Sequence, residues 1–594
     1  MAFNPILKLD YPDIDVIRVE DTYYMISTTM YFMPGGVILR SYDLVHWEIA
    51  SYVFDAHEDT PAARLSNGQN IYGQGMWAAS LRYHKGTFYV CFVANDTHKT
   101  YLYRANNIEG PWTKQYIEGF YHDCSLLFDD GRSYIVYGNT DIYLTELNDD
   151  LTAPKEGGLS RLLVSDNRGK VGLGYEGSHI YKIDGKYYLF LIHWPNHGTR
   201  RRTEACFVSD SLDGTFIGRD VVDDDMDYYN AGVAQGGIVD TPDGHWYSML
   251  FQDYGALGRI PVLIPVTFKN GFPVFGHLSG RLGKVPKKVK SISTRPGYHY
   301  APLYGGDDFH YPQETDGKVR LKTFWQWNHI PQDALWEIGM TQLPDEIISM
   351  SLHAEHTPTA DVDSPVPAVF HSVYCYRIKS GALCKNLTQA VNTLTQRFSG
   401  SVSTVTVTLN GTDLKDGDFA GLCALQGYYA FIGLTKEDGK YYIVVHERNR
   451  TDSPFEDKKN YDSEETARIP TDSPFVTLRA IADFCDRQDN VAFFYRIPGK
   501  HIPGADTCPA FKPKALPASM SPAPNPDTST GLSGTEDGIL PDIAGESFTA
   551  LGKPHKLYFT LDHFTGCRAG LFLYSTKETG GHAAFADFRF EAED

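Results

Sequence analysis

The chain has 594 residues, 13% of them Tyr, Phe or Trp, and a formal net charge of −20. The acidic balance argues against nucleic-acid and anionic-membrane partners, since both need basic patches. No run of about 18 apolar residues predicts a transmembrane helix. The nine cysteines are scattered and never in CxxC spacing, so neither a disulfide framework nor a structural zinc site is predicted.

An aromatic-rich strand pattern follows a turn five times between residues 21 and 251, in DTYYMIST, GTFYVCFV, GRSYIVYG, GKYYLFLI and GHWYSMLF. The fourth letter is always tyrosine, and these tyrosines are Tyr24, Tyr89, Tyr134, Tyr188 and Tyr247. Each interval can hold four short antiparallel strands, which is typical of a β-propeller. Five repeats predict five blades, and a long β-meander or a sandwich is the alternative.

A second set of residues keeps a constant distance from these tyrosines. The residues 11 or 12 positions before them are Asp13, Trp77, Asp123, Glu176 and Gln235. If the repeated strand is the second of each blade, this set lies on or near the innermost strand, which lines the central channel. Three of the five are carboxylic acids, and their convergence on one axis is expected to raise at least one pKa.

Two carboxylates across a sugar are the usual equipment for glycoside hydrolysis, and a third can adjust the pKa of the acid. Glu176, in GLGYEGSH, suits a partly desolvated proton donor, and Asp13, beside a proline turn, suits a solvated base. Trp77 and Trp194 could stack on a sugar ring. Taken singly, each acid could instead be a turn residue or an ion-pair partner.

Two further residues are candidates for the same site. His179 follows Glu176 by three positions, and it belongs either to the site or to an ordinary loop. Arg259 is a lone cation in the apolar segment GALGRIPV. A buried arginine needs an anion nearby, and the channel acids are candidates.

Several ordered segments resemble glycoside hydrolase family 43, in particular its β-xylosidase and α-L-arabinofuranosidase type with a C-terminal β-sandwich. The matching segments in the first half are YPDIDVIRV, MWAASLRYHKGTFYV, DCSLLFDDG, EGSHIYKIDGKYYLF and AQGGIVDTPDGHWYSMLFQDYGALGR. Those in the second half include FWQWNH, GDFAGLCALQGYYAFIGL and GLFLYSTKETGGHAAFADF.

The resemblance implies an all-β protein with two domains. A five-bladed catalytic propeller is expected at residues 1–300, and an antiparallel, lectin-like jelly-roll sandwich at 305–594. The alternating segment VSTVTVTLNGTDL also reads as strands with a turn at Asn-Gly. Residues 512–547 are rich in Pro, Ser, Gly and Thr and predict a mobile loop within the sandwich.

The resemblance also implies roles for individual residues. It makes Asp13 the general base, Glu176 the general acid and Asp123 the modulator of the acid's pKa, with inversion at the anomeric carbon. Arg259 matches a substrate-contacting arginine of the family, and Trp77 matches its sugar-stacking platform. The full set of expected substrate-binding residues is Trp77, Met30, Phe32, His179, Trp194, Gln235 and Arg259, with Met30 and Phe32 in the pocket wall.

No cofactor is expected to be required, and no metal ligand is assigned. Relatives often carry a histidine on the propeller axis, sometimes bound to calcium. Here Ala234 and Gln235 occupy that region, and Tyr254 stands where a histidine is usual. A structural calcium ion is therefore left in doubt.

The sequence thus predicts an exo-acting, inverting glycosidase that releases terminal α-L-arabinofuranose, β-D-xylose or both from plant cell-wall hemicellulose or its oligosaccharides. An endo-arabinanase and a non-catalytic carbohydrate-binding propeller are the alternatives, and homo-oligomerisation is left open. The N-terminus shows no basic region followed by an apolar stretch. A cytoplasmic location is expected if the sequence is complete, and a periplasmic or secreted one if a leader was removed.

Overall fold

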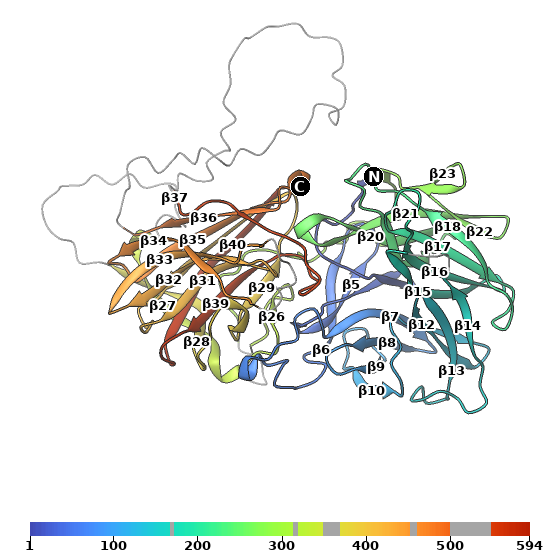
Figure 1. Cartoon of the computed structure of the whole chain (residues 1–594), viewed down its shortest axis with the longest axis horizontal. Coiled ribbons are helices and arrows are strands. Elements are labelled where there is room, and N and C mark those ends of the chain that lie inside the picture. Colours follow the sequence, from blue (N-terminus) through green and yellow to red (C-terminus); the bar gives the residue numbers. More distant parts are fainter. Residues whose placement is uncertain (167–170, 313–318, 348–368, 452–459, 499–547, 594) are drawn as a thin grey trace, which may run out of the picture.

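The structure, a computed structural model, describes residues 1–166, 171–312, 319–347, 369–451, 460–498 and 548–593. Two all-β bodies lie side by side, with the N-terminal half in one and the C-terminal half in the other (Figure 1). Within the described ranges, no helix has the length and apolar character needed to cross a membrane. The short 3-10 helices are η1 (Ser66–Gly68), η2 (Gly255–Leu257), η3 (Asp333–Leu335), η4 (Leu387–Gln389) and η5 (Cys485–Arg487).

Five antiparallel sheets, counted over the described residues, form the blades of a propeller. Blade 1 contains β2 (Asp15–Val19), β3 (Thr22–Ser27), β5 (Gly35–Ser41) and β6 (Glu48–Phe54). Blade 2 contains β7 (Met76–His84), β8 (Thr87–Ala94), β9 (Lys99–Ala105) and β10 (Thr113–Ile117). Blade 3 contains β11 (Ser125–Asp129), β12 (Arg132–Asn139), β13 (Asp141–Leu147) and β14 (Ser160–Ser165).

The last two blades complete the ring. Blade 4 contains β15 (Leu173–Ile183), β16 (Lys186–Trp194), β17 (Thr203–Ser209) and β18 (Ile217–Val222), extended by β24 (Leu282–Lys284) and β23 (His277–Ser279). Blade 5 contains β19 (Val233–Asp240), β20 (Trp246–Asp253), β21 (Arg259–Lys269) and β22 (Phe272–Phe275). The five repeated tyrosines lie on β3, β8, β12, β16 and β20, so the predicted second strand of each blade is confirmed.

The first strand of every blade is innermost. Contacts run from β2 to β7, β11, β15 and β19 and back to β2, which closes the ring around one axis. The chain start runs beside β21, with the Ile6 and Tyr11 N–H groups donating to the Pro261 and Arg259 carbonyls at 3.0 and 2.9 Å. Strand β1 (Ala2–Phe3) pairs with β25 (Lys288–Val289) at the end of the propeller. The first residues of the propeller are therefore bonded to its last strands.

Two large antiparallel sheets form the sandwich. One contains β26 (Gln326–Asn328), β29 (Leu394–Arg397), β31 (Asp418–Leu425), β32 (Ala430–Glu437), β33 (Lys440–Glu447), β34 (Glu464–Thr471) and β39 (Arg568–Ser575). The other contains β27 (Trp336–Pro344), β28 (Phe370–Lys379), β30 (Val402–Asn410), β35 (Phe475–Asp483), β36 (Asn490–Arg496), β37 (Thr549–Ala550), β38 (His555–Lys556) and β40 (His582–Glu593). The predicted mobile loop at 512–547 lies outside the described residues.

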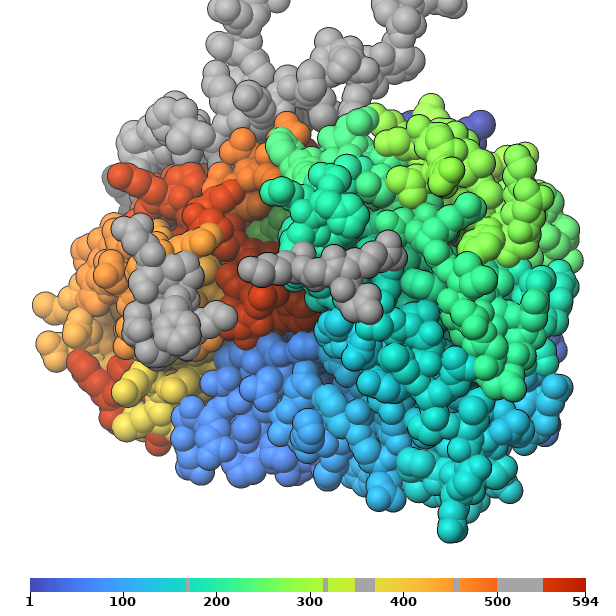
Figure 2. All heavy atoms as spheres, turned by 45° about the vertical axis from the view of Figure 1, so that its right-hand side comes forward, coloured from blue at the N-terminus to red at the C-terminus, as the bar shows by residue number. Residues whose placement is uncertain are grey.

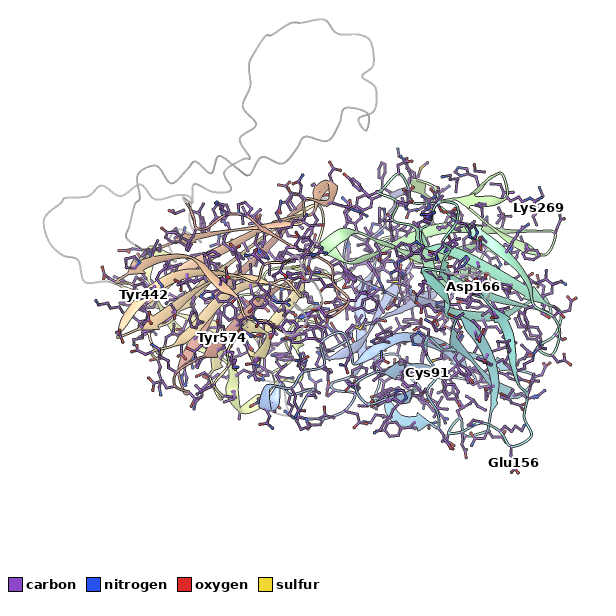
Figure 3. The ribbon with its side chains drawn as sticks, in the orientation of Figure 1. Cys91, Glu156, Asp166, Lys269, Tyr442 and Tyr574 are labelled. Carbon is purple, nitrogen blue, oxygen red and sulfur yellow. The ribbon has the colours of Figure 1, made fainter. Side chains whose placement is uncertain are left out.

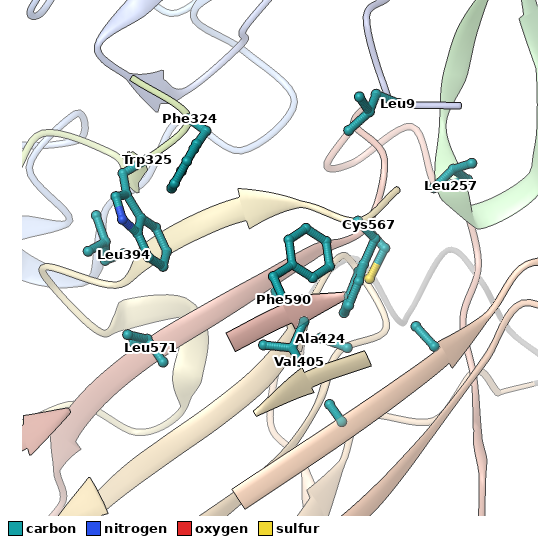
Figure 4. Close-up of a cluster of buried hydrophobic side chains, with 14 of the residues drawn as sticks. Leu9, Leu257, Phe324, Trp325, Leu394, Val405, Ala424, Cys567, Leu571 and Phe590 are labelled. Atoms are coloured by element: carbon teal, nitrogen blue, oxygen red, sulfur yellow. The ribbon is translucent and has the colours of Figure 1, made fainter. Parts of the chain in front are cut away.

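The two bodies share one strand and one hydrophobic core. Strand β4 (Phe32–Met33) leaves blade 1 and pairs with β26 at the edge of a sandwich sheet. Buried side chains pack continuously from one body into the other, and Leu9 and Leu257 of the propeller lie near Cys567 of the sandwich in Figure 4. The contact between the two bodies is therefore packed like a protein core, and this packing fixes their relative placement.

Side chains fill both bodies throughout (Figure 3). The cysteines of the described residues are all free, and six of them, Cys91 among them, are buried. Cys91 of β8 lies 3.5 Å from Cys124 of blade 3, sulfur to sulfur, so this pair packs as thiols between blades.

Candidate active site

The five residues at constant distance from the tyrosines gather at one end of the channel. Trp77, Glu176 and Gln235 lie near the starts of β7, β15 and β19, and Asp13 and Asp123 lie two positions before β2 and β11. Each of the five residues belongs to a different blade and lies at the same end of its innermost strand. Since these strands contact one another around the ring, the five residues share one end of the ring. We call this end of the ring the mouth.

The backbone at the mouth is irregular in a repeated way. Asp13, Asp123 and Gln235 have left-handed backbones, with φ of 53°, 48° and 59°. The strand register also shifts near the start of β7, β15 and β19. Bulges re-aim side chains, and strained conformations persist where the surroundings hold them. The repeated distortion thus directs side chains to the mouth instead of into the blade interiors.

Asp13 is paired with Arg259. The Arg259 Nη1 donates to Asp13 Oδ1 at 2.7 Å, and both side chains are almost fully buried. The Nε of Arg259 lies 3.4 Å from Asp253 Oδ1, so a second carboxylate shares the cation. The anion expected beside Arg259 is therefore chiefly Asp13, which this contact holds in one orientation.

Glu176 and Asp123 both approach the same nitrogen of His122. The Nε2 of His122 is 3.5 Å from Glu176 Oε2 and 3.7 Å from Asp123 Oδ2. Asn139 Nδ2 donates to Glu176 Oε2 at 2.5 Å, and the N–H of Gly177 donates to Asp123 Oδ2 at 3.1 Å. His122 and Glu176 keep 21% and 17% of their side-chain surface exposed, so this part of the site is open to solvent.

Burial and charge shift two pKa values here. Burial raises the pKa of Asp123 to about 7, the carboxylates of Glu176 and Asp13 add to the rise, and the positive His122 opposes it. Burial alone would lower the pKa of His122, but Asp123 and Glu176 outweigh it and raise that pKa to about 9. Asp123 therefore changes its charge near neutral pH, as expected of one member of a cluster of acids. We call Asp13, His122, Asp123, Glu176 and Arg259 the mouth cluster.

The sandwich supplies part of the wall. The ring of Phe564 lies against the Arg259 guanidinium at 4.4 Å and against the ring of Trp77 at 5.6 Å, and Phe559 also lies near Arg259. Trp77 in turn lies 5.7 Å from the ring of His122. Figure 2 shows the red C-terminal segment at the floor of a hollow between the orange sandwich strands and the propeller blades. One face of the mouth is therefore aromatic and comes from both bodies.

His179 does not join the mouth cluster. Its Nδ1 lies 3.2 Å from Asp15 Oδ1, and Arg82 Nη1 donates to Asp15 Oδ2 at 2.6 Å. Arg82 also donates to Ser125 Oγ at 2.7 Å, and the Tyr181 hydroxyl donates to Asp15 at 3.4 Å. We call Asp15, Arg82, His179 and Tyr181 the axial cluster. It ties blades 1 to 4 together along the channel.

The axial cluster does not fit a calcium ion. Calcium takes six to eight oxygen ligands. Both carboxylate oxygens of Asp15 are already engaged, Oδ2 also by the Leu81 N–H at 2.8 Å. The guanidinium of Arg82 places a positive charge beside them. The carboxylate on the axis therefore binds the internal cation Arg82.

Trp194 and Gln235 of the expected binding set have different surroundings. Trp194 is 40% exposed at the end of β16, where its Nε1 donates to the Arg200 carbonyl at 2.5 Å. Gln235 is buried, and its side chain packs against Gly177. A Cβ added to Gly177 would lie 2.8 Å from the Cγ of Gln235, so the Gln235 side chain is a neighbour of Glu176.

Met30 and Phe32 differ from the expectation of a pocket wall. Phe32 is fully buried in β4, under the guanidinium of Arg568 at 3.5 Å, because this strand is inserted into the sandwich sheet. Met30 is 1% exposed, and its carbonyl accepts a bond from the Met76 N–H at 3.1 Å. Met30 therefore holds the backbone just before Trp77 through this hydrogen bond, and Phe32 belongs to the interface between the two bodies.

Sequence reasoning missed several residues of the site, and they differ in how visible they are in the sequence. His122 could have been noticed because it directly precedes Asp123, and Asn139 because it ends the repeated strand of blade 3. Phe564 gives no such signal, since it lies far along the chain in the sandwich and reaches the mouth only through tertiary packing.

This fold and site define a class of protein. Carboxylates that can donate and accept protons, an arginine and an aromatic wall at the mouth of a five-bladed propeller are the parts of a glycoside hydrolase.

Comparison with known families agrees. The family model for glycosyl hydrolases family 43 matches residues 2–273, and the β-xylosidase C-terminal concanavalin A-like domain matches residues 371–505. The chain belongs to glycosyl hydrolase family 43, whose members invert the anomeric centre.

Named relatives fall into two activities. A xylan 1,3-β-xylosidase of Vibrio sp. is 31% identical over 475 residues, which cover 74% of this chain and 78% of that protein. A non-reducing end α-L-arabinofuranosidase of Bacteroides ovatus is 30% identical over 361 residues, 58% of this chain and 64% of that protein.

A solved structure matches over the whole chain. It is described as a bifunctional GH43-CE protein of Bacteroides eggerthii, with a TM-score of 0.77 and 34% identity. The match covers 100% of this chain and 64% of the other, so the chain spans about two thirds of that protein.

Proposed function

We propose that the protein is an exo-acting, inverting pentosidase that releases terminal α-L-arabinofuranose, β-D-xylose or both from plant cell-wall hemicellulose or its oligosaccharides. The observation that carries the proposal is the mouth cluster, in which Asp13 and Glu176 come from different blades beside an aromatic wall. The xylosidase and arabinofuranosidase activities named for the relatives support this class of substrate.

The proposed roles follow from the contacts. Glu176 donates a proton to the leaving oxygen while Asp13 takes a proton from a water that attacks the opposite face of the sugar, which inverts the anomeric centre. Arg259 supports this role of Asp13, because its bond of 2.7 Å fixes the carboxylate. The Nε2 of His122 faces both Glu176 and Asp123, so a proton on this nitrogen can be shared with either carboxylate.

Exo-cleavage is supported by what the sandwich places at the mouth. Phe564 and Phe559 lie against Arg259 at 4.4 and 5.8 Å, so an aromatic side chain from the second body stands on one side of the acid-base pair. A site closed on one side admits a chain end more readily than the middle of a polymer. Trp77, which is half-buried beside Phe564 and His122, is the proposed platform for stacking on the terminal sugar.

The test compares wild type with Glu176→Gln on 4-nitrophenyl α-L-arabinofuranoside and β-D-xylopyranoside, and follows the anomer of released sugar by proton NMR. We expect release of one or both sugars with inversion. On xylobiose or an arabinofuranosyl oligosaccharide, whose sugar leaving groups need a proton, Glu176→Gln is expected to lower the rate by roughly 10²–10⁴-fold because the proton donor is lost. The ratio of the two wild-type rates names the preferred sugar.

A matched control is Glu337→Gln, which changes a 59% exposed carboxylate of the sandwich. It is expected to keep wild-type rates. Release from neither substrate, together with cleavage inside arabinan, would identify an endo-enzyme. Sugar binding without turnover, unchanged in Glu176→Gln, would identify a non-catalytic binding propeller.

A further inference from the structure

A buried carboxylate outside the mouth cluster joins the two bodies directly behind Arg259. Asp10 is 4% exposed. Its Oδ1 accepts the N–H of Arg259 at 2.9 Å, and its Oδ2 accepts the N–H of Gly566 at 2.8 Å. One oxygen therefore holds the propeller strand that carries Arg259, and the other holds the sandwich segment that carries Phe564.

The backbone of Arg259 is held on both sides by this part of the chain. Its N–H goes to Asp10, and its carbonyl accepts the Tyr11 N–H at 2.9 Å. Gly258 has φ of 108°, and a Cβ there would come within 2.2 Å of Asp10 Oδ1. Only a glycine allows the carboxylate so close, so the approach of Asp10 is built into the local sequence.

The sandwich segment is fastened at the same place. The N–H of Cys567 donates to the Ala256 carbonyl at 2.8 Å. Gln426 of the sandwich donates through Nε2 to the carbonyls of Ala256 at 3.3 Å and Thr565 at 3.0 Å. These bonds lie within three residues of Phe564 and of Arg259, so they fix both partners of the ring–guanidinium contact.

Cations of the sandwich partly offset the buried charge of Asp10. Arg397 donates through Nε to the Asp10 carbonyl at 2.8 Å. Burial raises the pKa of Asp10, while the bonds from Arg259 and Gly566 and the charges of Arg397 and Arg568 oppose the rise. Arg397 and Arg568, two of the cations near Asp10, belong to the sandwich, whereas Arg259 belongs to the propeller.

We propose that Asp10 is a positioning residue through which the sandwich sets the guanidinium of Arg259, and through it the carboxylate of Asp13. This inference rests on the proposed function, because it assigns Asp10 a part in the same reaction. Asp10 does not touch the reacting atoms. It fixes the strand from which Arg259 reaches Asp13 at 2.7 Å.

The variant Asp10→Asn tests this link at nearly constant volume. An amide offers one acceptor oxygen and one NH₂ group, so one of the two backbone N–H groups loses its partner and faces a donor instead. We expect kcat to fall by roughly 10- to 100-fold, since small displacements of catalytic groups have effects of this size. A crystal structure of Asp10→Asn is expected to show Arg259 withdrawn from Asp13.

The matched control is Asp307→Asn. Asp307 is also buried, and its oxygens accept bonds from the Trp325 indole N–H at 2.7 Å and the Phe309 N–H at 2.9 Å, away from Arg259. It is expected to lower Tm as Asp10→Asn does, with kcat within about twofold of wild type. A folded Asp10→Asn that keeps wild-type kcat, or keeps the Arg259–Asp13 bond, overturns the proposal.

If Asp10→Asn does not fold, Gln426→Leu decides. It removes the neighbouring bonds to Ala256 and Thr565 without touching Asp10, and kcat is expected to fall by about threefold or more. An unchanged kcat in Gln426→Leu then counts against the proposal. If wild type itself cleaves no pentoside, the proposed function fails, while the crystal structure of either variant still shows whether Arg259 depends on these bonds.

Discussion

Two clusters along one propeller axis contain buried carboxylates, and the charges of these carboxylates are balanced differently. In the axial cluster, burial would raise the pKa of Asp15, but Arg82 and His179 outweigh burial and lower it. In the mouth cluster, the pKa of Asp123 stands at about 7, because burial and two carboxylates outweigh His122. Cations therefore hold Asp15, the acid that links the blades, in its charged form. The charge of Asp123 is left only partly compensated, at the place where a proton has to move.

The largest effect on stability is expected from breaking the axial cluster. Arg82→Met removes the guanidinium beside the buried Asp15 and leaves only His179, Tyr181 and a backbone N–H as its partners, which should reduce the free energy of unfolding by about 3–5 kcal/mol. Urea denaturation measures this loss. Arg377→Met is the control, because its partner Glu337 is exposed and such surface pairs contribute about 0–1 kcal/mol. Equal losses in the two variants would contradict the comparison.

Removing the charge of Asp123 is expected to act in the opposite direction. Its pKa is raised from 3.8 to about 7, so the folded chain binds the proton more tightly than the unfolded chain, and stability falls as pH rises from about 4 to 7. Asp123→Asn should therefore be more stable than wild type at pH 8 by roughly 1–3 kcal/mol, with the gain shrinking towards pH 4.

Asp15→Asn sharpens that test. The pKa of Asp15 is lowered, so its contribution to stability is present at neutral pH and is lost only as pH falls below its ordinary value of 3.8. Urea denaturation at pH 8 should find Asp15→Asn less stable than wild type and Asp123→Asn more stable. The same sign for both variants would show that the two clusters do not differ as described.

A smaller effect is expected from the aromatic wall. Phe564→Ala removes the ring over Arg259 and beside Trp77, and should lower kcat/KM by about tenfold, equivalent to ~1.4 kcal/mol, chiefly through a higher KM. Steady-state kinetics on the better pentoside measure this. Phe370→Ala, at a 46% exposed phenylalanine of the sandwich, is expected to change neither constant. An unaltered KM in Phe564→Ala would remove this residue from the site.

The smallest effect is expected from chelation. We propose that the enzyme needs no axial metal, because Arg82 supplies the positive charge beside Asp15. Treatment with EDTA should leave kcat and Tm unchanged, and added calcium should not raise Tm. A fall in Tm that calcium restores would contradict this proposal.

Regular repetition made much of this fold predictable. The spacing of Tyr24 and its four equivalents reports the length of a blade, and the position 11 or 12 residues earlier reports the start of the innermost strand. Asp13, Asp123 and Glu176 could be found in this way because a propeller repeats its geometry about an axis.

What could not be predicted depends on contacts outside the repeat. Phe32 reads like a wall residue, yet β4 pairs with a strand of the other body and buries it. Phe564 reaches the mouth from the end of the chain, and no local pattern marks it. His179 follows Glu176 closely in sequence, but strand alternation and a bulge direct it to Asp15 on the axis.

The insertion of β4 into the sandwich sheet also means that two paired strands are synthesised at very different times. Phe32 and Met33 leave the ribosome early, but their partner strand β26 begins only at Gln326. At about 5–20 residues per second, roughly tens of seconds separate the two events. During that time an apolar strand edge waits without its partner, as a template for wrong pairing. The sheet of the first blade is complete at Phe54, whereas the β4 segment that leaves it is covered only after β26 has been translated.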